Sequence, residues 1–303
     1  MSLHRYAFGN YATRKKIDKF KFYLSNRRKL TADNPPLIIY QMGKVGSSSI
    51  NRSLKKYWTA SPVYRVHVLT EGGLQRLDHV IRNAYAKTRF IPLHLIVSEF
   101  LRPHLSISPS KIKWNIITLV RDPIARNISS FFQDLGTRHH YFDYPTSAGN
   151  EKFNRAVEEL VGMYLDNHDH ARPLTWFDSE FGRTFNMDIY DYRFDREKGF
   201  SIIKEDDCRV LVLKLEALDR CAASAFQEFL KIDNFELIND NLAREKKYAS
   251  LYQQFKKAIV LPEKYIEMMY NTKFVNHFYT QDEINRFRQR WSRARQCSSD
   301  GKI

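Results

Sequence analysis

A lysine, two glycines and three serines stand together behind an apolar run near the start of the chain. Pro36 to Tyr40 is typical of a buried strand, and a helix is expected after the serines, which are common helix caps. A glycine-rich loop at a helix N-terminus turns backbone amides toward an anion, and Lys44 adds a full positive charge. The stretch therefore predicts a phosphate or sulfate site formed by Lys44, Gly46, Ser47, Ser48 and Ser49.

The order of residues in this loop argues against a nucleoside triphosphatase. Such a loop has the pattern G-x-x-x-x-G-K-[ST], in which the lysine follows the second glycine and a hydroxyl binds magnesium. Here Lys44 precedes Gly46, and Val45 occupies the position that the hydroxyl would need.

A second polar motif follows the apolar run from Trp114 to Val120. Asp122 is expected to cap a helix that begins at Pro123, and Arg121 stands just before it. Ser129 lies off the apolar stripe of that helix. Because open α/β sheets bind ligands at the carboxyl ends of their strands, Arg121 and Ser129 are expected to face one ligand.

These two motifs resemble those of the sulfotransferases that use 3′-phosphoadenosine 5′-phosphosulfate (PAPS). K-V-G-S-S-S resembles the phosphosulfate loop of carbohydrate sulfotransferases, and R-D-P-I-A-R-N-I-S resembles their 3′-phosphate motif. The resemblance implies a P-loop-like α/β domain and sulfuryl transfer to a hydroxyl of a glycan or glycolipid, with adenosine 3′,5′-bisphosphate as product and no metal. It further implies that the Lys44 loop binds the 5′-phosphosulfate and that Arg121 and Ser129 bind the 3′-phosphate.

Three later segments resemble a bacterial branch of capsular polysaccharide synthesis proteins. They are residues 173–181, 188–190 and 271–279. The last segment is expected to close over the nucleotide, with Lys273 as a phosphate contact. In V-L-V-L-K-L-E the family's usual tyrosine is replaced by Leu215, so the adenine-binding residues stay open.

Sulfuryl transfer needs a base for the attacking hydroxyl, and a histidine suits neutral pH. His67 is expected to lie on the strand after the loop unit, residues 62–69, where the resemblance to hexuronic 2-O-sulfotransferases predicts a catalytic H-x-H pair. Arg65 replaces the first histidine of that pair. We therefore expect His67 to be the base, with Glu71 in reserve, and Lys44 to donate to the leaving phosphate. His94 is expected to be a surface or packing residue.

Composition points to an anionic partner and a reducing compartment. The 303 residues carry a net charge of +15 and have a pI near 9.6. The three cysteines form no C-x-x-C pair, so neither a disulfide framework nor a metal site is expected. No apolar stretch has the length of a membrane helix. The expected location is the cytoplasm, in a bacterium.

Alternation of strands and helices predicts an α/β fold, with a parallel sheet flanked by helices on both faces and a mostly helical C-terminal half. Residues 1–33 are expected to form a basic arm, residues 34–295 a single domain with a helical insertion at 150–195, and residues 296–303 a frayed tail. Ile17, Phe20 and Leu24 form a thin apolar stripe in the arm. Two interpretations are open for the arm: loose packing on the domain, or peripheral contact with anionic lipid.

Two other functions compete with sulfuryl transfer. A nucleotide-dependent kinase on the same scaffold would lack a use for the 3′-phosphate motif. A basic module that binds nucleic acid would account for the charge, but no nucleic-acid motif is present, so no nucleic-acid partner is expected. The sequence leaves the oligomeric state open.

Overall fold

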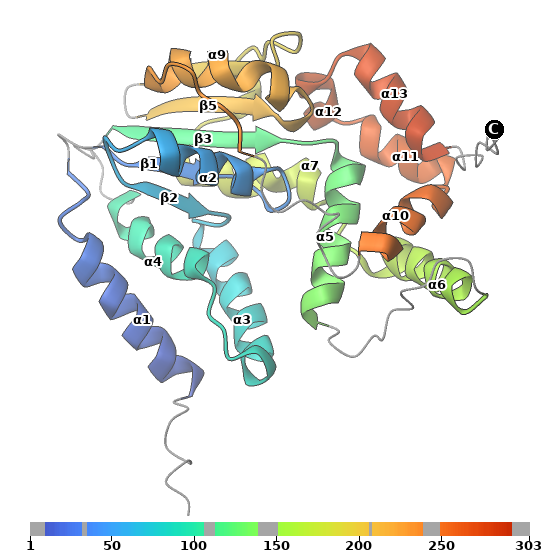
Figure 1. The fold of residues 1–303 in the computed structure, drawn as a ribbon, viewed down its shortest axis with the longest axis horizontal. Helices are drawn as coiled ribbons and strands as arrows, with labels where there is room; N and C mark the ends of the chain where they lie inside the picture. The colour runs from blue at the N-terminus through green and yellow to red at the C-terminus, as the bar shows by residue number, and fades with distance from the viewer. Residues whose placement is uncertain are drawn as a thin grey trace, which may run out of the picture. The chain divides into compact units, whose positions relative to one another are not determined.

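A five-stranded sheet with the strand order β2-β1-β3-β5-β4 is built from strands that lie on both sides of the middle of the sequence (Figure 1). The computed structural model describes residues 10–31, 35–105, 113–138, 151–205, 208–238 and 249–292. The strands are β1 (Leu37–Tyr40), β2 (Val63–Val66), β3 (Trp114–Val120), β4 (Phe200–Lys204) and β5 (Cys208–Lys214).

The sheet is mixed, which corrects the expectation of an all-parallel sheet. Strands β2, β1, β3 and β5 run parallel, and Leu37 on β1 is opposite Val63 on β2 and Asn115 on β3. The edge strand β4 is antiparallel to β5. Only a few residues separate β4 from β5, and so short a connection can join antiparallel neighbours but not parallel ones.

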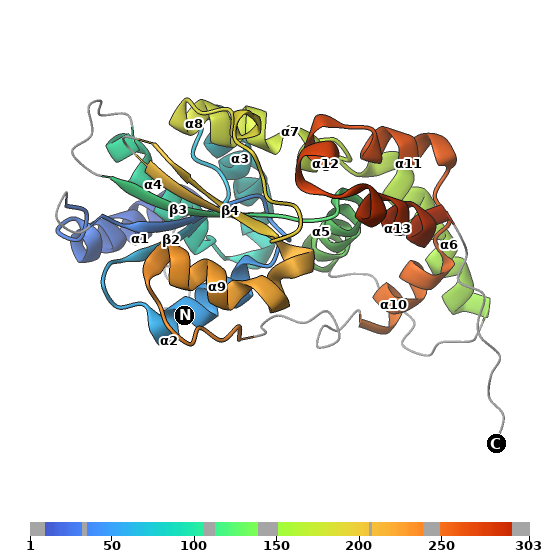
Figure 2. The same ribbon diagram turned by 90° about the horizontal axis from the view of Figure 1, so that it is seen from above.

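Helices cover both faces of the sheet, as expected. Figure 2 shows α2 (Ser47–Tyr57) and α9 (Leu218–Leu230) on one face, and α3 (Glu71–Thr88), α4 (Leu93–Leu105) and α8 (Arg183–Phe185) on the other. Strands β1, β3 and β5 are buried almost throughout, which explains their continuous apolar runs. Helix α1 (Tyr11–Asn26) packs against α4.

The chain folds into two compact units, each assembled from separate stretches of sequence. Unit 1 comprises residues 1–120 and 176–238, and unit 2 comprises residues 121–175 and 239–303. The expectation of one domain over residues 34–295 stays a prediction. The helices of unit 2 are α5 (Pro123–Arg138), α6 (Glu151–Asn167), α7 (Arg172–Trp176, its last residue in unit 1), α10 (Ala249–Ala258), α11 (Glu263–Tyr270), α12 (Lys273–Phe278) and α13 (Gln281–Ser292).

Three short helical turns complete unit 1. One of them is a π-helical turn, η1, in the segment that the sequence predicts to be a helical insertion. Their bounds are η1 (Phe177–Gly182), η2 (Ile189–Asp191) and η3 (Leu215–Ala217). Within the described residues, no helix combines the length and the apolar character that crossing a bilayer requires.

Candidate active site

The loop between β1 and α2, which the sequence predicts to bind an anion, contains two residues with left-handed backbone. Lys44 has φ +75° and Gly46 has φ +98°, and α2 begins at the next residue, Ser47. A Cβ on Gly46 would lie 2.5 Å from Cδ1 of Leu215, so position 46 requires glycine both for its conformation and for space. A lysine in the left-handed region costs of order 1–3 kcal/mol, and such strain is concentrated at functional sites.

Positive charge is concentrated at the N-terminus of α2. The first turn of this helix holds no acidic residue to compensate the helix dipole. Arg65 on β2 adds a cation there, because its Nη1 donates to Ser48 Oγ at 3.1 Å. A guanidinium at a helix N-terminus is unfavourable unless an anion is also bound. The N-terminus of α2 and the Arg65 guanidinium beside it are therefore both electropositive, and Lys44 lies two residues before the N-cap Gly46.

The role of Arg65 was missed from the sequence, where it counted only as the residue that replaces a histidine. The signal was nevertheless present. Arg65 alternates with the buried Tyr64 and Val66 along its strand, and in the structure it is opposite Ile39. Because Arg65 lies on the strand next to the end of β1, its side chain can reach the loop that follows β1.

His67 lies directly after β2 and is connected to the first residue of the loop. Its Nδ1 lies 2.9 Å from the backbone carbonyl oxygen of Gln41, and 3.4 Å from Nε2 of the same residue. A carbonyl oxygen can only accept, so the shorter contact places the proton on Nδ1. The neutral imidazole then carries its lone pair on Nε2, the form that a general base requires.

A second histidine packs against the first. The ring centroids of His67 and His94 lie 5.1 Å apart, in agreement with a packing role for His94. Burial and, to a smaller extent, the nearby charge of Arg65 together lower the pKa of His94 to about 4. His94 is therefore neutral at physiological pH and adds no charge beside His67.

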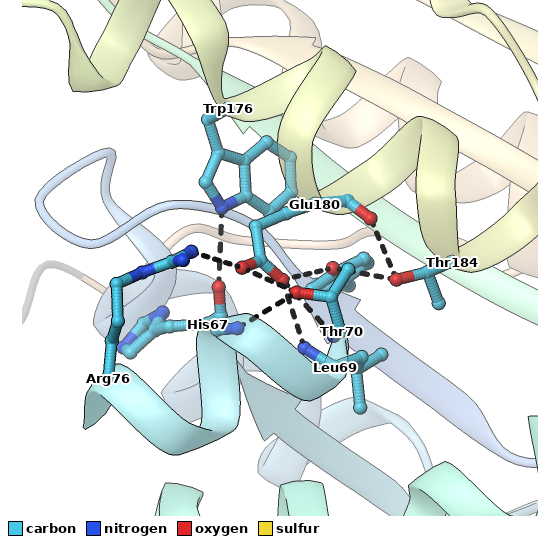
Figure 3. Close-up of polar contacts among 9 residues, drawn as sticks. His67, Leu69, Thr70, Arg76, Trp176, Glu180 and Thr184 are labelled. Carbon is cyan, nitrogen blue, oxygen red and sulfur yellow. Dashed lines mark hydrogen bonds and ion pairs between the residues drawn. The ribbon is translucent and has the colours of Figure 1, made fainter. Parts of the chain in front are cut away.

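The turn that carries His67 is fastened to a buried glutamate (Figure 3). Glu180 is only 2% exposed, and its Oε2 accepts from the backbone amides of Leu69 at 3.2 Å and Thr70 at 3.3 Å. Its Oε1 accepts from the Thr70 hydroxyl at 2.9 Å. The hydroxyl of Tyr40, the last residue of β1, donates to Oε2 at 3.2 Å. These bonds compensate the desolvation of a buried carboxylate.

Two neighbours complete this arrangement. Trp176 donates from Nε1 to the carbonyl oxygen of His67 at 3.2 Å. Arg76 lies 3.7 Å from Glu180 Oε1, but its side chain is 69% exposed and this ion pair contributes little. Burial and the charge of Glu180 raise the pKa of Tyr40, which keeps its hydroxyl protonated as a donor.

Glu71, the reserve base, is engaged elsewhere. It is the first residue of α3, and its carboxylate accepts from Nη2 of Arg102 at 3.0 Å. The Glu71 side chain is 67% exposed and lines a surface pocket with residues of α1 and α4. Of the two candidates, His67 is the one with a described contact to the loop between β1 and α2.

The remaining predicted site residues belong to unit 2. Arg121 precedes α5, Ser129 lies within α5, and Lys273 is the first residue of α12. Asp122 caps α5 as expected, with Oδ1 accepting from the amide of Ile124 at 3.0 Å. The buried Asp122 carboxylate also accepts from Tyr270 and Trp291.

Comparison with known proteins gives one family match. Residues 150–280 match the model of the NKWYS family, described as "Putative capsular polysaccharide synthesis protein". No curated protein and no solved structure was found that matches the chain. The matched range contains Trp176 and Glu180, which fasten the His67 turn, and Lys273. Residues 150–280 of the protein are thus similar to a family linked to capsular polysaccharide synthesis.

Proposed function

We propose that the protein transfers the sulfuryl group of PAPS to a hydroxyl of a glycan or glycolipid acceptor. One observation carries the proposal: the candidate base is hydrogen-bonded to the first residue of the candidate anion loop, through His67 Nδ1 and the Gln41 carbonyl. An anion site and a base in direct connection are what transfer from an anionic donor to a hydroxyl requires. The similarity to a capsular polysaccharide family supports a glycan acceptor.

The residues present suit the phosphosulfate group. The loop amides, Lys44 and Arg65 are all donors, and the first turn of α2 has no carboxylate to repel an anion. Arg121, Ser129 and Lys273 are assigned to the 3′-phosphate and its surroundings by the sequence motifs alone. A kinase that uses ATP has no 3′-phosphate to bind, so a 3′-phosphate motif argues against the kinase alternative.

The proposed reaction is an in-line displacement at sulfur. The acceptor oxygen forms a new S–O bond while the bond from sulfur to the bridging phosphate oxygen breaks. His67 takes the acceptor proton at Nε2. Lys44 and Arg65 stabilise the charge that develops on the departing phosphate and the transferred group.

Adenosine 3′,5′-bisphosphate is expected to stabilise the protein without added metal, whereas ATP with magnesium is not. A ligand at 100 times its Kd adds about 2.7 kcal/mol to the free energy of unfolding, which raises Tm by several degrees. Differential scanning fluorimetry measures both shifts. A transfer assay with PAPS and a panel of glycans, scored by the mass of one added sulfate, tests the reaction itself. Equal shifts with both nucleotides, or no sulfated product, would contradict the proposal.

We also propose that α1 contacts anionic lipid. Within unit 1 the helix is attached to α3 and α4 by Lys15, which pairs with Asp78 of α3 and Glu99 of α4. The apolar stripe of the arm is not the docked side, because Ile17, Phe20 and Leu24 are 44–63% exposed.

The charges beside this stripe favour a lipid surface as its partner. Exposed basic residues accompany the stripe, whereas the one acidic residue of α1, Asp18, pairs with Arg14 at 3.0 Å. An exposed apolar stripe edged by cations is typical of helices that lie in the headgroup region of a bilayer. The basic residues are Arg14, Lys16, Lys19, Lys21, Arg27 and Arg28.

The protein is expected to co-sediment with vesicles of phosphatidylcholine containing phosphatidylglycerol, and not with pure phosphatidylcholine. Replacing both Lys21 and Arg28 with glutamine should weaken binding about 30-fold, since each basic residue near the surface contributes about 1 kcal/mol. Phe20→Ser should also weaken it, while Met268→Ser, at a half-exposed position in unit 2, should not. Equal binding to both vesicles, or a dimer in light scattering that Phe20→Ser dissociates, would refute the lipid assignment.

A further inference from the structure

The hydrogen bond between His67 and Gln41 spans two segments of chain that meet at one buried carboxylate. Gln41 directly follows Tyr40, whose hydroxyl donates to Glu180. His67 precedes Leu69 and Thr70, whose backbone amides donate to the same carboxylate. Both partners of the His67 contact are thus placed relative to a single group.

We propose that Glu180 is a positioning residue that sets the tautomer and orientation of His67. This inference rests on the proposed role of His67 as the base. Glu180 does not touch the imidazole. It acts by fixing the backbone on either side of the 2.9 Å contact between His67 Nδ1 and the Gln41 carbonyl, and thereby keeps the lone pair on Nε2.

The geometry of η1 brings the carboxylate to this position. Glu180 lies in the π-helical turn Phe177–Gly182, and π-turns are frequent at functional sites. The same segment begins after Trp176, whose indole holds the carbonyl of His67. Trp176 and Glu180, four residues apart in the sequence, therefore both hold the turn from His67 to Thr70.

A glycine in α3 leaves the space that Glu180 occupies. A Cβ on Gly73 would lie 2.1 Å from Glu180 Oε1 and 2.8 Å from Thr70 Oγ1. A Cβ on the adjacent Gly72 would meet only Nη1 of Arg76, at 3.4 Å, and that group is the end of a flexible side chain. Gly73→Ala is therefore expected to displace the Glu180 carboxylate, whereas Gly72→Ala is expected to leave it in place.

Gly73→Ala is expected to lower kcat about 100-fold, the effect of misplacing a catalytic group by about 1 Å, while affinity for adenosine 3′,5′-bisphosphate stays near the wild-type value. Gly72→Ala is the matched control and should retain wild-type kcat. Glu180→Gln keeps the volume of the side chain but removes one of two acceptor oxygens, and should show the same loss as Gly73→Ala. It also serves as the test if Gly73→Ala fails to fold.

Nitrogen-15 NMR of the imidazole rings shows whether Glu180 controls the tautomer of His67 or only stabilises the fold. In wild-type protein and Gly72→Ala, His67 should show a protonated Nδ1 and an unprotonated Nε2 at high pH, and in Gly73→Ala a mixture of tautomers. A lower Tm with an unchanged His67 spectrum and unchanged kcat would overturn the proposal. If the wild-type protein transfers no sulfate, the proposed function fails, whereas the NMR comparison still decides whether Glu180 controls His67.

Discussion

His67→Ala is expected to reduce sulfuryl transfer by about 10²- to 10⁴-fold, the usual contribution of a positioned general base. Affinity for adenosine 3′,5′-bisphosphate should stay almost unchanged, because the phosphates bind to other residues. Initial rates with saturating PAPS measure the first quantity, and isothermal titration calorimetry measures the second. Loss of binding together with catalysis would show damage to the fold and would reject the assignment.

The pH dependence gives an independent check on the same residue. A base must be deprotonated, so kcat/KM of the wild-type enzyme should rise with pH through the range in which a histidine loses its proton. His94 cannot produce this limb above pH 5, because burial lowers its pKa to about 4. The limb should disappear in His67→Ala and persist in Glu71→Gln. If it disappears in Glu71→Gln instead, Glu71 is the base despite its contact with Arg102.

Lys44→Gly should lower catalysis without lowering the stability of the fold. Removing a charged donor to a developing anion is expected to lower kcat about 10²- to 10³-fold. The free energy of unfolding should not fall, because glycine relieves the strain of a side chain at φ +75° by about 1 kcal/mol. Chemical denaturation and steady-state kinetics on the same preparation measure both effects.

A matched control for this variant exists in the same unit. Lys231 also has a positive φ, +59°, at the C-terminal end of α9. Lys231→Gly should give a similar gain in stability and leave sulfuryl transfer unaffected. Wild-type turnover in Lys44→Gly would remove Lys44 from the mechanism, and a marked loss of stability would show that the loop needs the lysine for folding.

Local patterns predicted the elements that carry the two motifs. The run from Trp114 to Val120 is apolar throughout because β3 is buried on both faces, and the structure has the strand at those residues. The helix predicted to begin at Pro123 begins there, and Asp122 caps it through the amide of Ile124. In such segments burial and capping are encoded within a few neighbouring residues.

The direction of a strand and the contacts between residues far apart in the sequence are not encoded within a few neighbouring residues. The apolar run at Phe200 does not by itself give the direction of β4, since a short run looks the same in either direction; only the short connection to β5 indicates an antiparallel pair. Glu180 had no detectable role in the sequence, because its partners Leu69 and Thr70 are more than a hundred residues earlier. A carboxylate is also expected at the surface unless its partners are known.

The interleaved arrangement of the two units has a consequence for the order in which the protein can fold during synthesis. The central strand β3 pairs with β1 on one side and with β5 on the other, and Trp114 is opposite Cys208. A ribosome releases all of residues 121–175, a stretch of unit 2, before β5 exists. Until then one long, apolar edge of β3 has exposed backbone donors and acceptors, a state prone to aggregation. During synthesis the β3 edge must therefore be shielded until β5 is made. A chain that lacked β5 would leave this edge of β3 exposed permanently.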